Sequence, residues 1–203
     1  MTMTQLKQVK FTVQSGLVIA DPCYLEERIS ESSRGIIYLP NAAGEWVADI
    51  DISDEGMWGD RVSHLNARRV SIIEGCAKQG GPYYETRRID GLGVDSGQMS
   101  IIPVERTPLD YEALLMEHDK YNHERKMLDF GGGVVSSTGF GDGCYEGTVE
   151  YDSWGLSKIT VQFIFPEEEE AVCVNCGDDA TEENYTYCYE CWWGEDENKD
   201  EEE

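Results

Sequence analysis

Four cysteines near the C-terminus constrain the fold of this chain more than any other feature of its 203 residues. They form two CxxC pairs, Cys173 with Cys176 and Cys188 with Cys191, separated by eleven residues. Each pair makes a tight turn that points both sulfurs at one ion, and four thiolates suit tetrahedral zinc. We therefore expect a zinc ribbon over residues 167–194. The zinc should be structural, because a four-cysteine site leaves no coordination position for a substrate.

The remaining three cysteines and the lack of a long apolar segment predict where in the cell the protein is found. Cys23, Cys76 and Cys144 are an odd, widely spaced set, which suits reduced thiols better than a disulfide framework. No segment approaches the roughly 18 consecutive apolar residues of a membrane span. We expect a cytoplasmic protein with no membrane association, and leave its oligomeric state open.

Negative charge is concentrated at the C-terminal end. The chain has 41 acidic and 16 basic residues, a formal net charge of −25, and residues 167–203 hold 16 of the acids but one base. Such a region repels phosphates, which disfavours direct binding of nucleic acid and favours a basic macromolecule, most naturally a protein. We expect residues 195–203 to form a disordered acidic tail. The candidate partner-binding residues are Glu182, Glu183, Glu190, Trp192 and Trp193.

Residues 1–166 are expected to form the main domain, which is mostly β. Short β-branched or alternating segments separated by turn-forming residues predict strands. A hairpin is predicted between residues 145–151 and 156–165, with Ile159, Val161, Phe163 and Phe165 on one face. The other predicted strands are residues 10–13, 17–20, 35–39, 46–52, 69–73 and 99–104.

One helix is predicted between these strands, from Thr107 to about Leu128. Thr107 can cap it, Pro108 suits its first turn, and Asp110 complements its dipole. Four residues share the i, i+3, i+4, i+7 spacing of an amphipathic helix face packed on a sheet: Tyr111, Leu114, Leu115 and His118. The predicted fold class is therefore α+β, a predominantly antiparallel β domain with one long helix plus a small C-terminal zinc ribbon.

Three loops carry aspartate beside turn-forming residues: Asp21 in DPCY, Asp95 in VDSGQ and Asp142 in GDGCY. In one hypothesis these carboxylates converge on magnesium or calcium, while Ser96, Gln98 and Tyr145 contact a ligand. In the other, which we favour, each aspartate accepts a hydrogen bond from its own turn two residues on. No sequence motif for nucleophilic or metal-dependent catalysis is present.

The VDSGQ motif, the later GDGxY motif and the terminal hairpin together resemble a family of small bacterial and phage proteins of unknown function. This resemblance implies a compact, predominantly β domain and no established reaction. It covers Asp95 to Gln98, Gly141 to Tyr145 and the hairpin through Phe165, and the zinc ribbon lies outside it. A phage-encoded protein would act in the cytoplasm of its bacterial host.

Three classes of function remain open. The favoured class is a non-catalytic acidic zinc-binding interaction protein, for example a phage-type inhibitor or modulator of a host nucleic-acid-binding or defence protein. The alternatives are a small-ligand (nucleotide) binding protein that uses the Asp and Gly loops, and a metal-dependent hydrolase on the same loops.

Overall fold

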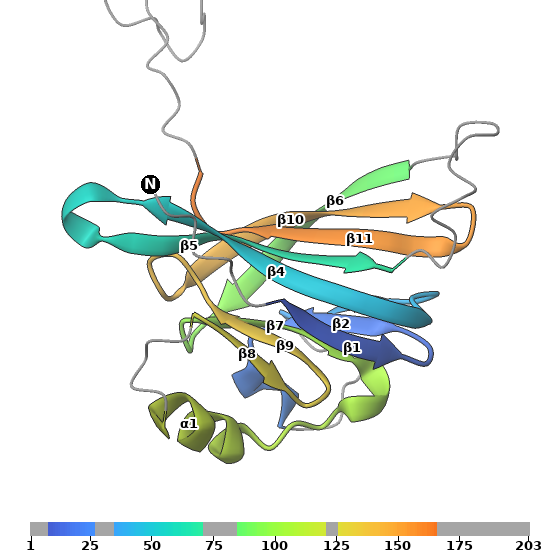
Figure 1. The fold of residues 1–203 in the computed structure, drawn as a ribbon, viewed down its shortest axis with the longest axis horizontal. Helices are drawn as coiled ribbons and strands as arrows, with labels where there is room; N and C mark the ends of the chain where they lie inside the picture. Colours follow the sequence, from blue (N-terminus) through green and yellow to red (C-terminus); the bar gives the residue numbers. More distant parts are fainter. Residues whose placement is uncertain (1–7, 27–34, 71–84, 121–125, 166–203) are drawn as a thin grey trace, which may run out of the picture. The chain divides into compact units, whose positions relative to one another are not determined.

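A computed structural model describes residues 8–26, 35–70, 85–120 and 126–165 (Figure 1). The chain divides into two units, Met1–Phe165 and Pro166–Glu203, and the fold below belongs to the first. The predicted zinc ribbon, its four cysteines, the acidic tail and the candidate partner residues lie outside the described residues.

The first unit contains two antiparallel sheets. The larger, sheet A, has the strand order β1 (Val9–Val13), β4 (Gly44–Asp54), β5 (Asp60–Arg69), β11 (Gly155–Gln162), β10 (Gly143–Asp152) and β6 (Glu85–Val94). The smaller, sheet B, has the order β3 (Ile37–Leu39), β2 (Leu17–Ala20), β7 (Gln98–Pro103), β9 (Gly133–Ser137) and β8 (Met127–Phe130). The described helices are α1 (Tyr111–Lys120) and three short 3-10 helices, η1 (Pro22–Leu25), η2 (Gly56–Trp58) and η3 (Val104–Arg106).

Strand β11 shows how alternation places side chains in this fold. Ile159 and Val161 are fully buried, while Thr160 and Gln162 between and beside them are partly exposed on the opposite face of sheet A. One face of sheet A is therefore core and the other is polar.

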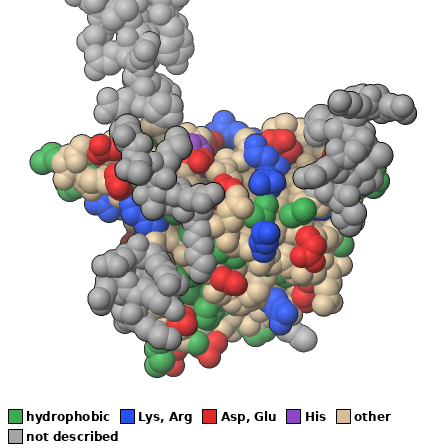
Figure 2. Space-filling view, viewed as in Figure 1, with side chains coloured by type: hydrophobic (Ala, Val, Ile, Leu, Met, Phe, Trp, Pro, Cys, Tyr) green, Lys and Arg blue, Asp and Glu red, His purple; other side chains and the backbone are tan. Residues whose placement is uncertain are grey.

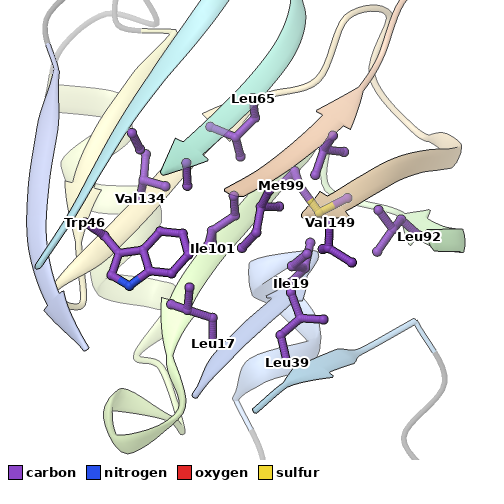
Figure 3. Close-up of a cluster of buried hydrophobic side chains, with 14 of the residues drawn as sticks. Leu17, Ile19, Leu39, Trp46, Leu65, Leu92, Met99, Ile101, Val134 and Val149 are labelled. Atoms are coloured by element: carbon purple, nitrogen blue, oxygen red, sulfur yellow. The ribbon is translucent and has the colours of Figure 1, made fainter. Parts of the chain in front are cut away.

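The main hydrophobic core lies between the two sheets (Figure 3). Trp46 of β4 is fully buried there, and its indole nitrogen donates a 2.7 Å hydrogen bond to the carbonyl oxygen of Ala42, so its polar atom is satisfied. Leu17 and Ile19 of β2 enter the core from sheet B, and Leu65 of β5 enters it from sheet A.

A second, smaller core lies on the other face of sheet B. Val18 and Ala20 of β2 and Ile102 of β7 contribute from the sheet, while Leu25 of η1 and Leu114 of α1 cover them. Sheet B is thus buried on both faces where η1 and α1 lie against it (Figure 1). This arrangement positions η1 and α1 next to the turn that enters β7.

The structure confirms a β-dominated α+β domain, and most predicted strands coincide with observed ones. Leu17–Ala20 is correct at both ends. The predicted hairpin is β10 paired with β11, with Phe163 buried but Phe165 46% exposed. The strand predicted at residues 69–73 is wrong at its start: β5 covers Asp60–Arg69 and ends where that strand was expected to begin, and residues 71–73 lie outside the described residues.

The helix prediction is wrong at both ends. Asp110, rather than Thr107, caps α1, because its Oδ1 accepts a 2.9 Å hydrogen bond from the Ala113 amide. Leu128 lies in strand β8, since Gly131 and Gly132 adopt positive φ and close a two-residue hairpin between β8 and β9. Within the described ranges, no helix is long and apolar enough to cross a membrane.

Candidate functional site

The turn between β6 and β7 brings three of the predicted site residues together: Asp21, Asp95 and Ser96. Ala20, the last residue of β2, pairs with Ser100 in β7, so Asp21 continues toward the start of β7. The turn at residues 95–97 precedes β7 and therefore lies beside Asp21. Two loops that are more than 70 residues apart in sequence meet at this point.

Asp21 is completely buried and its carboxylate accepts hydrogen bonds at both oxygens. Oδ1 accepts from the Cys23 amide at 2.8 Å and from the Ser96 hydroxyl at 2.6 Å. Oδ2 accepts from the amides of Asp95 and Ser96, both at 2.8 Å. The bond to Cys23 is the turn bond two residues on that the sequence predicts, whereas the bonds to Asp95 and Ser96 join distant loops. Four donors satisfy this buried charge, as a buried carboxylate requires.

Two tyrosines lie next to the residues that bind Asp21. The Tyr24 hydroxyl donates a 2.6 Å hydrogen bond to Oδ2 of Asp95, whose side chain is exposed. The Tyr111 hydroxyl, at the start of α1, shares a hydrogen bond with Ser96. Sequence reasoning assigned neither tyrosine to the site; Tyr24 lies in the DPCY motif, but nothing local pairs it with Asp95.

Burial, hydrogen bonds and nearby negative charge raise the pKa values of three groups in this network, Cys23, Tyr24 and Tyr111. Burial, a hydrogen bond with Asp21 and the surrounding carboxylates raise the pKa of the Cys23 thiol from 9.0 to about 12. The hydrogen bond to Asp95, followed by burial, raises the pKa of Tyr24, and burial raises the pKa of Tyr111. At neutral pH these three groups are protonated, so Cys23 is a poor nucleophile.

The third loop packs against the same turn. The Thr138 amide donates to the carbonyl oxygen of Gly97 at 3.0 Å, and a side chain at Gly97 would lie 3.7 Å from the Gly141 Cα atom. The Tyr145 hydroxyl donates to the Gly141 carbonyl at 2.7 Å. Its ring is buried and meets Phe163 edge to face at 5.2 Å. Tyr145 therefore holds the loop from inside the core.

The other predicted residues are not gathered around a shared centre. Gln98 is 6% exposed and lies in β7, and its Oε1 has no protein hydrogen-bond partner. Asp142 is exposed in the third loop. Among the residues that the structure describes, no group of three or more His, Cys, Asp or Glu side chains is placed to hold a metal ion. The converging-carboxylate hypothesis gains no support there.

Two open grooves lie on the polar face of sheet A, between β6, β10 and β11. The larger has a volume of about 400 Å³ and is lined by Arg88, Asp90, Cys144, Glu146 and Phe165 among others. The smaller, of about 190 Å³, shares Arg88 and Glu146 with it. Arg88 forms an ion pair with Asp90 at 2.6 Å and another with Glu146. The cation in these grooves is thus already compensated by the protein's own carboxylates.

The described part of the chain is a β-rich domain in which two sheets are locked at one turn by a buried aspartate. Comparisons with family models, with curated proteins and with solved structures find no match for the chain. The resemblance to the family that carries VDSGQ and GDGxY stays a prediction.

Proposed function

We propose that this protein is a non-catalytic, acidic, zinc-binding interaction protein whose partner is a basic macromolecule, most simply a protein. Its formal net charge of −25 favours a cationic partner and opposes binding to nucleic acid. A phage-type inhibitor of a host nucleic-acid-binding or defence protein is a concrete form of this proposal, with carboxylates standing where DNA phosphates would lie.

The state of Asp21 is the observation that supports this proposal most. Its carboxylate is fully buried, and four hydrogen bonds from its own chain occupy both oxygens. A carboxylate used in this way is unsuited to hold an ion or to move a proton, because either task would break bonds that satisfy a buried charge. The loops whose sequence most resembles a catalytic or metal site therefore serve to stabilise the folded domain.

The proposed C-terminal module supplies the charge for recognition. Cys173, Cys176, Cys188 and Cys191 would hold one structural zinc ion and give residues 167–194 a fixed shape. Glu182, Glu183 and Glu190 would then steer a basic partner, with Trp192 and Trp193 as apolar anchors. Steering of this kind acts mainly on the association rate and weakens as salt rises.

Affinity capture with the full chain, followed by binding measurements on the purified partner, tests the proposal. We expect the affinity to fall markedly between about 0.05 M and 0.5 M salt, as screening of exposed charges requires. A variant that lacks residues 167–203 should bind more weakly and with a smaller salt dependence. An affinity that is independent of salt in the full chain would overturn the proposal.

A nucleotide-binding function is the alternative with an observation in its favour. The groove of about 400 Å³ on sheet A has a volume within the usual range for small-ligand sites, and Arg88 lines it. Thermal unfolding of the full chain with and without nucleotides separates the two functions, because a ligand that binds only the folded state raises the unfolding temperature. Stabilisation that disappears in Arg88→Gln would favour this alternative.

A further inference from the structure

The β4–β5 hairpin extends past its neighbouring strands as a two-stranded arm. Among the residues that the structure describes, strand β1 pairs with β4 from Gly44 to Ala48, and β11 pairs with β5 from His64 to Arg68. Beyond these positions the hairpin residues pair with one another, ending at Asp54 opposite Asp60. Figure 1 shows this turn at one end of sheet A. We call residues 54–60 the hairpin tip.

Internal hydrogen bonds give the hairpin tip a defined shape. Gly56 and Gly59 adopt φ of 60° and 68°, which other residues rarely tolerate. The Trp58 amide donates to the Glu55 carbonyl at 3.2 Å, and the Gly56 amide donates to Oδ1 of Asp54 at 3.1 Å. The tip is therefore organised before any partner arrives, which reduces the conformational entropy lost on binding.

Two large apolar side chains are exposed at the hairpin tip. Met57 is 92% exposed and Trp58 is 61% exposed. Figure 2, drawn from the same side as Figure 1, shows hydrophobic side chains at this end, with acidic ones close behind them. Tryptophan and methionine are enriched at protein interfaces, and tryptophan is among the commonest residues to dominate binding energy.

Acidic side chains surround these apolar residues. Asp54 lies directly opposite Asp60, and like charges in that relation destabilise a hairpin. Glu55 adds a third acid within the tip, and exposed Asp51 lies just behind it. Two basic residues lie at the base of the tip: Lys126, whose ammonium donates to the main-chain oxygen of Asp60, and Arg61, whose guanidinium lies 5.8 Å from the centre of the Phe140 ring. The tip thus combines an exposed apolar pair with three carboxylates, one of which, Asp54, also holds the turn through the Gly56 amide.

We propose that the hairpin tip, whose three carboxylates lie outward of the two basic residues Arg61 and Lys126 at its base, is a docking surface for a protein that presents an apolar depression bordered by lysine or arginine. This inference rests on the proposed function as an interaction protein, and it adds a recognition element within the β domain. Met57 and Trp58 would fill the depression, while Asp54, Glu55 and Asp60 would face the basic border.

The charge of the tip argues against other occupants. Nucleic acids and anionic membranes carry the same sign and would be repelled. A second copy of the chain carries a net charge of −25 and would be repelled as well. A basic protein surface alone gains from both the apolar and the acidic residues of the tip.

Fluorine NMR of the full chain, labelled with 5-fluorotryptophan, can locate binding at individual tryptophans. The five tryptophans give five signals, which single Trp→Phe variants assign. The probe is a synthetic amphipathic helical peptide of leucine and lysine, added in about 0.15 M salt. Trp154 is a matched control, because it is 66% exposed at the β10–β11 turn and its neighbour Asp152 already pairs with Arg69 at 2.6 Å.

We expect the peptide to shift the Trp58 signal and to leave the Trp154 signal in place. In Met57→Ser the peptide concentration needed to shift Trp58 should rise by about tenfold, as for loss of an interface anchor. The double variant Asp54→Asn with Asp60→Asn keeps the Oδ1 acceptor for Gly56 and removes two charges. It should need roughly threefold to tenfold more peptide, since exposed charges each contribute modestly.

Other results overturn the inference and are distinguishable from one another. Shifts confined to Trp192 and Trp193 would place binding in the acidic C-terminal region, so that the proposed function stands and the docking surface falls. No shift at any tryptophan would overturn both. A Trp58 shift caused by neutral phosphatidylcholine vesicles but not by the peptide, or by raising the protein concentration alone, would assign the tip to a membrane or to a second copy.

Discussion

The Tyr24 hydroxyl donates a 2.6 Å hydrogen bond to Asp95 Oδ2, across 71 residues of sequence. Asp21, three residues before Tyr24, accepts a hydrogen bond from the Asp95 main-chain amide. Within the segment at residues 21–24, Asp21 therefore accepts a hydrogen bond from the β6–β7 turn and Tyr24 donates one to it. This reciprocal pairing fixes the turn that joins sheet A to sheet B, and it leads to the first prediction.

Asp21→Asn should destabilise the domain nearly as much as Asp21→Ala, by about 3 kcal/mol, because both carboxylate oxygens accept two hydrogen bonds each. An asparagine replaces one acceptor with an NH₂ group that would face donors. Asp95→Asn is the control: its carbonyl oxygen can still accept from Tyr24, so the loss should stay under about 1 kcal/mol. Urea unfolding measures all three. Equal stability of Asp21→Asn and the wild type would contradict the assigned geometry.

Cys23 should react with iodoacetamide far more slowly than Cys144 at about pH 8. Burial and the neighbouring carboxylates raise the pKa of Cys23 to about 12, and the thiolate is the reactive form. Cys144 is free and exposed at the start of β10. Mass spectrometry of the two tryptic peptides over time gives both rates in one sample. Faster modification of Cys23 would show that its thiol is not held protonated.

The same raised pKa makes the contribution of Cys23 to stability depend on alkaline pH. Its pKa is 9.0 ordinarily and about 12 in the folded domain, so the folded state holds the proton more tightly. The stabilising contribution is therefore complete below about pH 9 and is lost as pH rises toward about 12. Unfolding free energies of the wild type and Cys23→Ala should converge over that interval. Parallel curves for the wild type and Cys23→Ala over that interval would refute the prediction.

Leu114→Ala should destabilise the domain by about 2–5 kcal/mol, because Leu114 is fully buried and anchors α1 on sheet B. Its neighbour Leu115 is 41% exposed on the same helix, so Leu115→Ala is a matched control with an expected change of under about 0.5 kcal/mol. Chemical denaturation followed by circular dichroism measures both. Similar losses for the two variants would mean that α1 packs through a different face.

Zinc should bind at one ion per chain, and its removal should leave the β domain folded. The expectation follows from the two CxxC pairs and from the separate hydrophobic cores of the first unit. Metal analysis of protein prepared without chelator measures the stoichiometry. Circular dichroism before and after chelation should retain the β signal. Absence of zinc from protein with reduced thiols would remove the zinc ribbon from the proposed function.

Strands with strong alternation could be predicted from sequence, and polar ones could not. Leu17–Ala20 and the β10–β11 hairpin carry β-branched and apolar residues in the required pattern. Strand β5 lies inside sheet A, yet its sequence DRVSHLNARR is mostly polar, because its contribution to the main core is limited to Val62, Leu65 and Ala67. Its pairing with β4 and β11, rather than its composition, makes it a strand.

The helix end was missed because two local signals compete. Residues 121–128 contain neither glycine nor proline, which permits a longer helix. Gly131 and Gly132 provide the positive φ angles of a tight hairpin turn, and that turn requires Met127–Phe130 to be extended. The hairpin turn at Gly131 and Gly132 therefore determines the structure of this segment, and the helix ends before it.

One of the four hydrogen bonds to Asp21 could be predicted from the sequence. The bond from the Cys23 amide to Asp21 is local, and the aspartate–proline pair before it predicts such a turn. The bonds to Asp95 and Ser96 depend on the β2–β7 register, which no single segment encodes. The hairpin tip is similar: Met57 and Trp58 are visible in the sequence, but only the pairing of β4 with β5 shows that they are exposed.

Strand β2 lies between two cores, and its four residues serve them alternately. Leu17 and Ile19 enter the main core, whereas Val18 and Ala20 enter the second one. A slip of one residue would exchange these pairs, placing the two larger side chains under α1 and leaving the smaller ones between the sheets. The slip would overfill one space and leave voids in the other. The volumes of both cores thus select the same register of β2. An insertion or deletion inside β2 should therefore destabilise the domain whichever way the strand shifts, whereas a strand with a solvent-facing side could accommodate the change on that side.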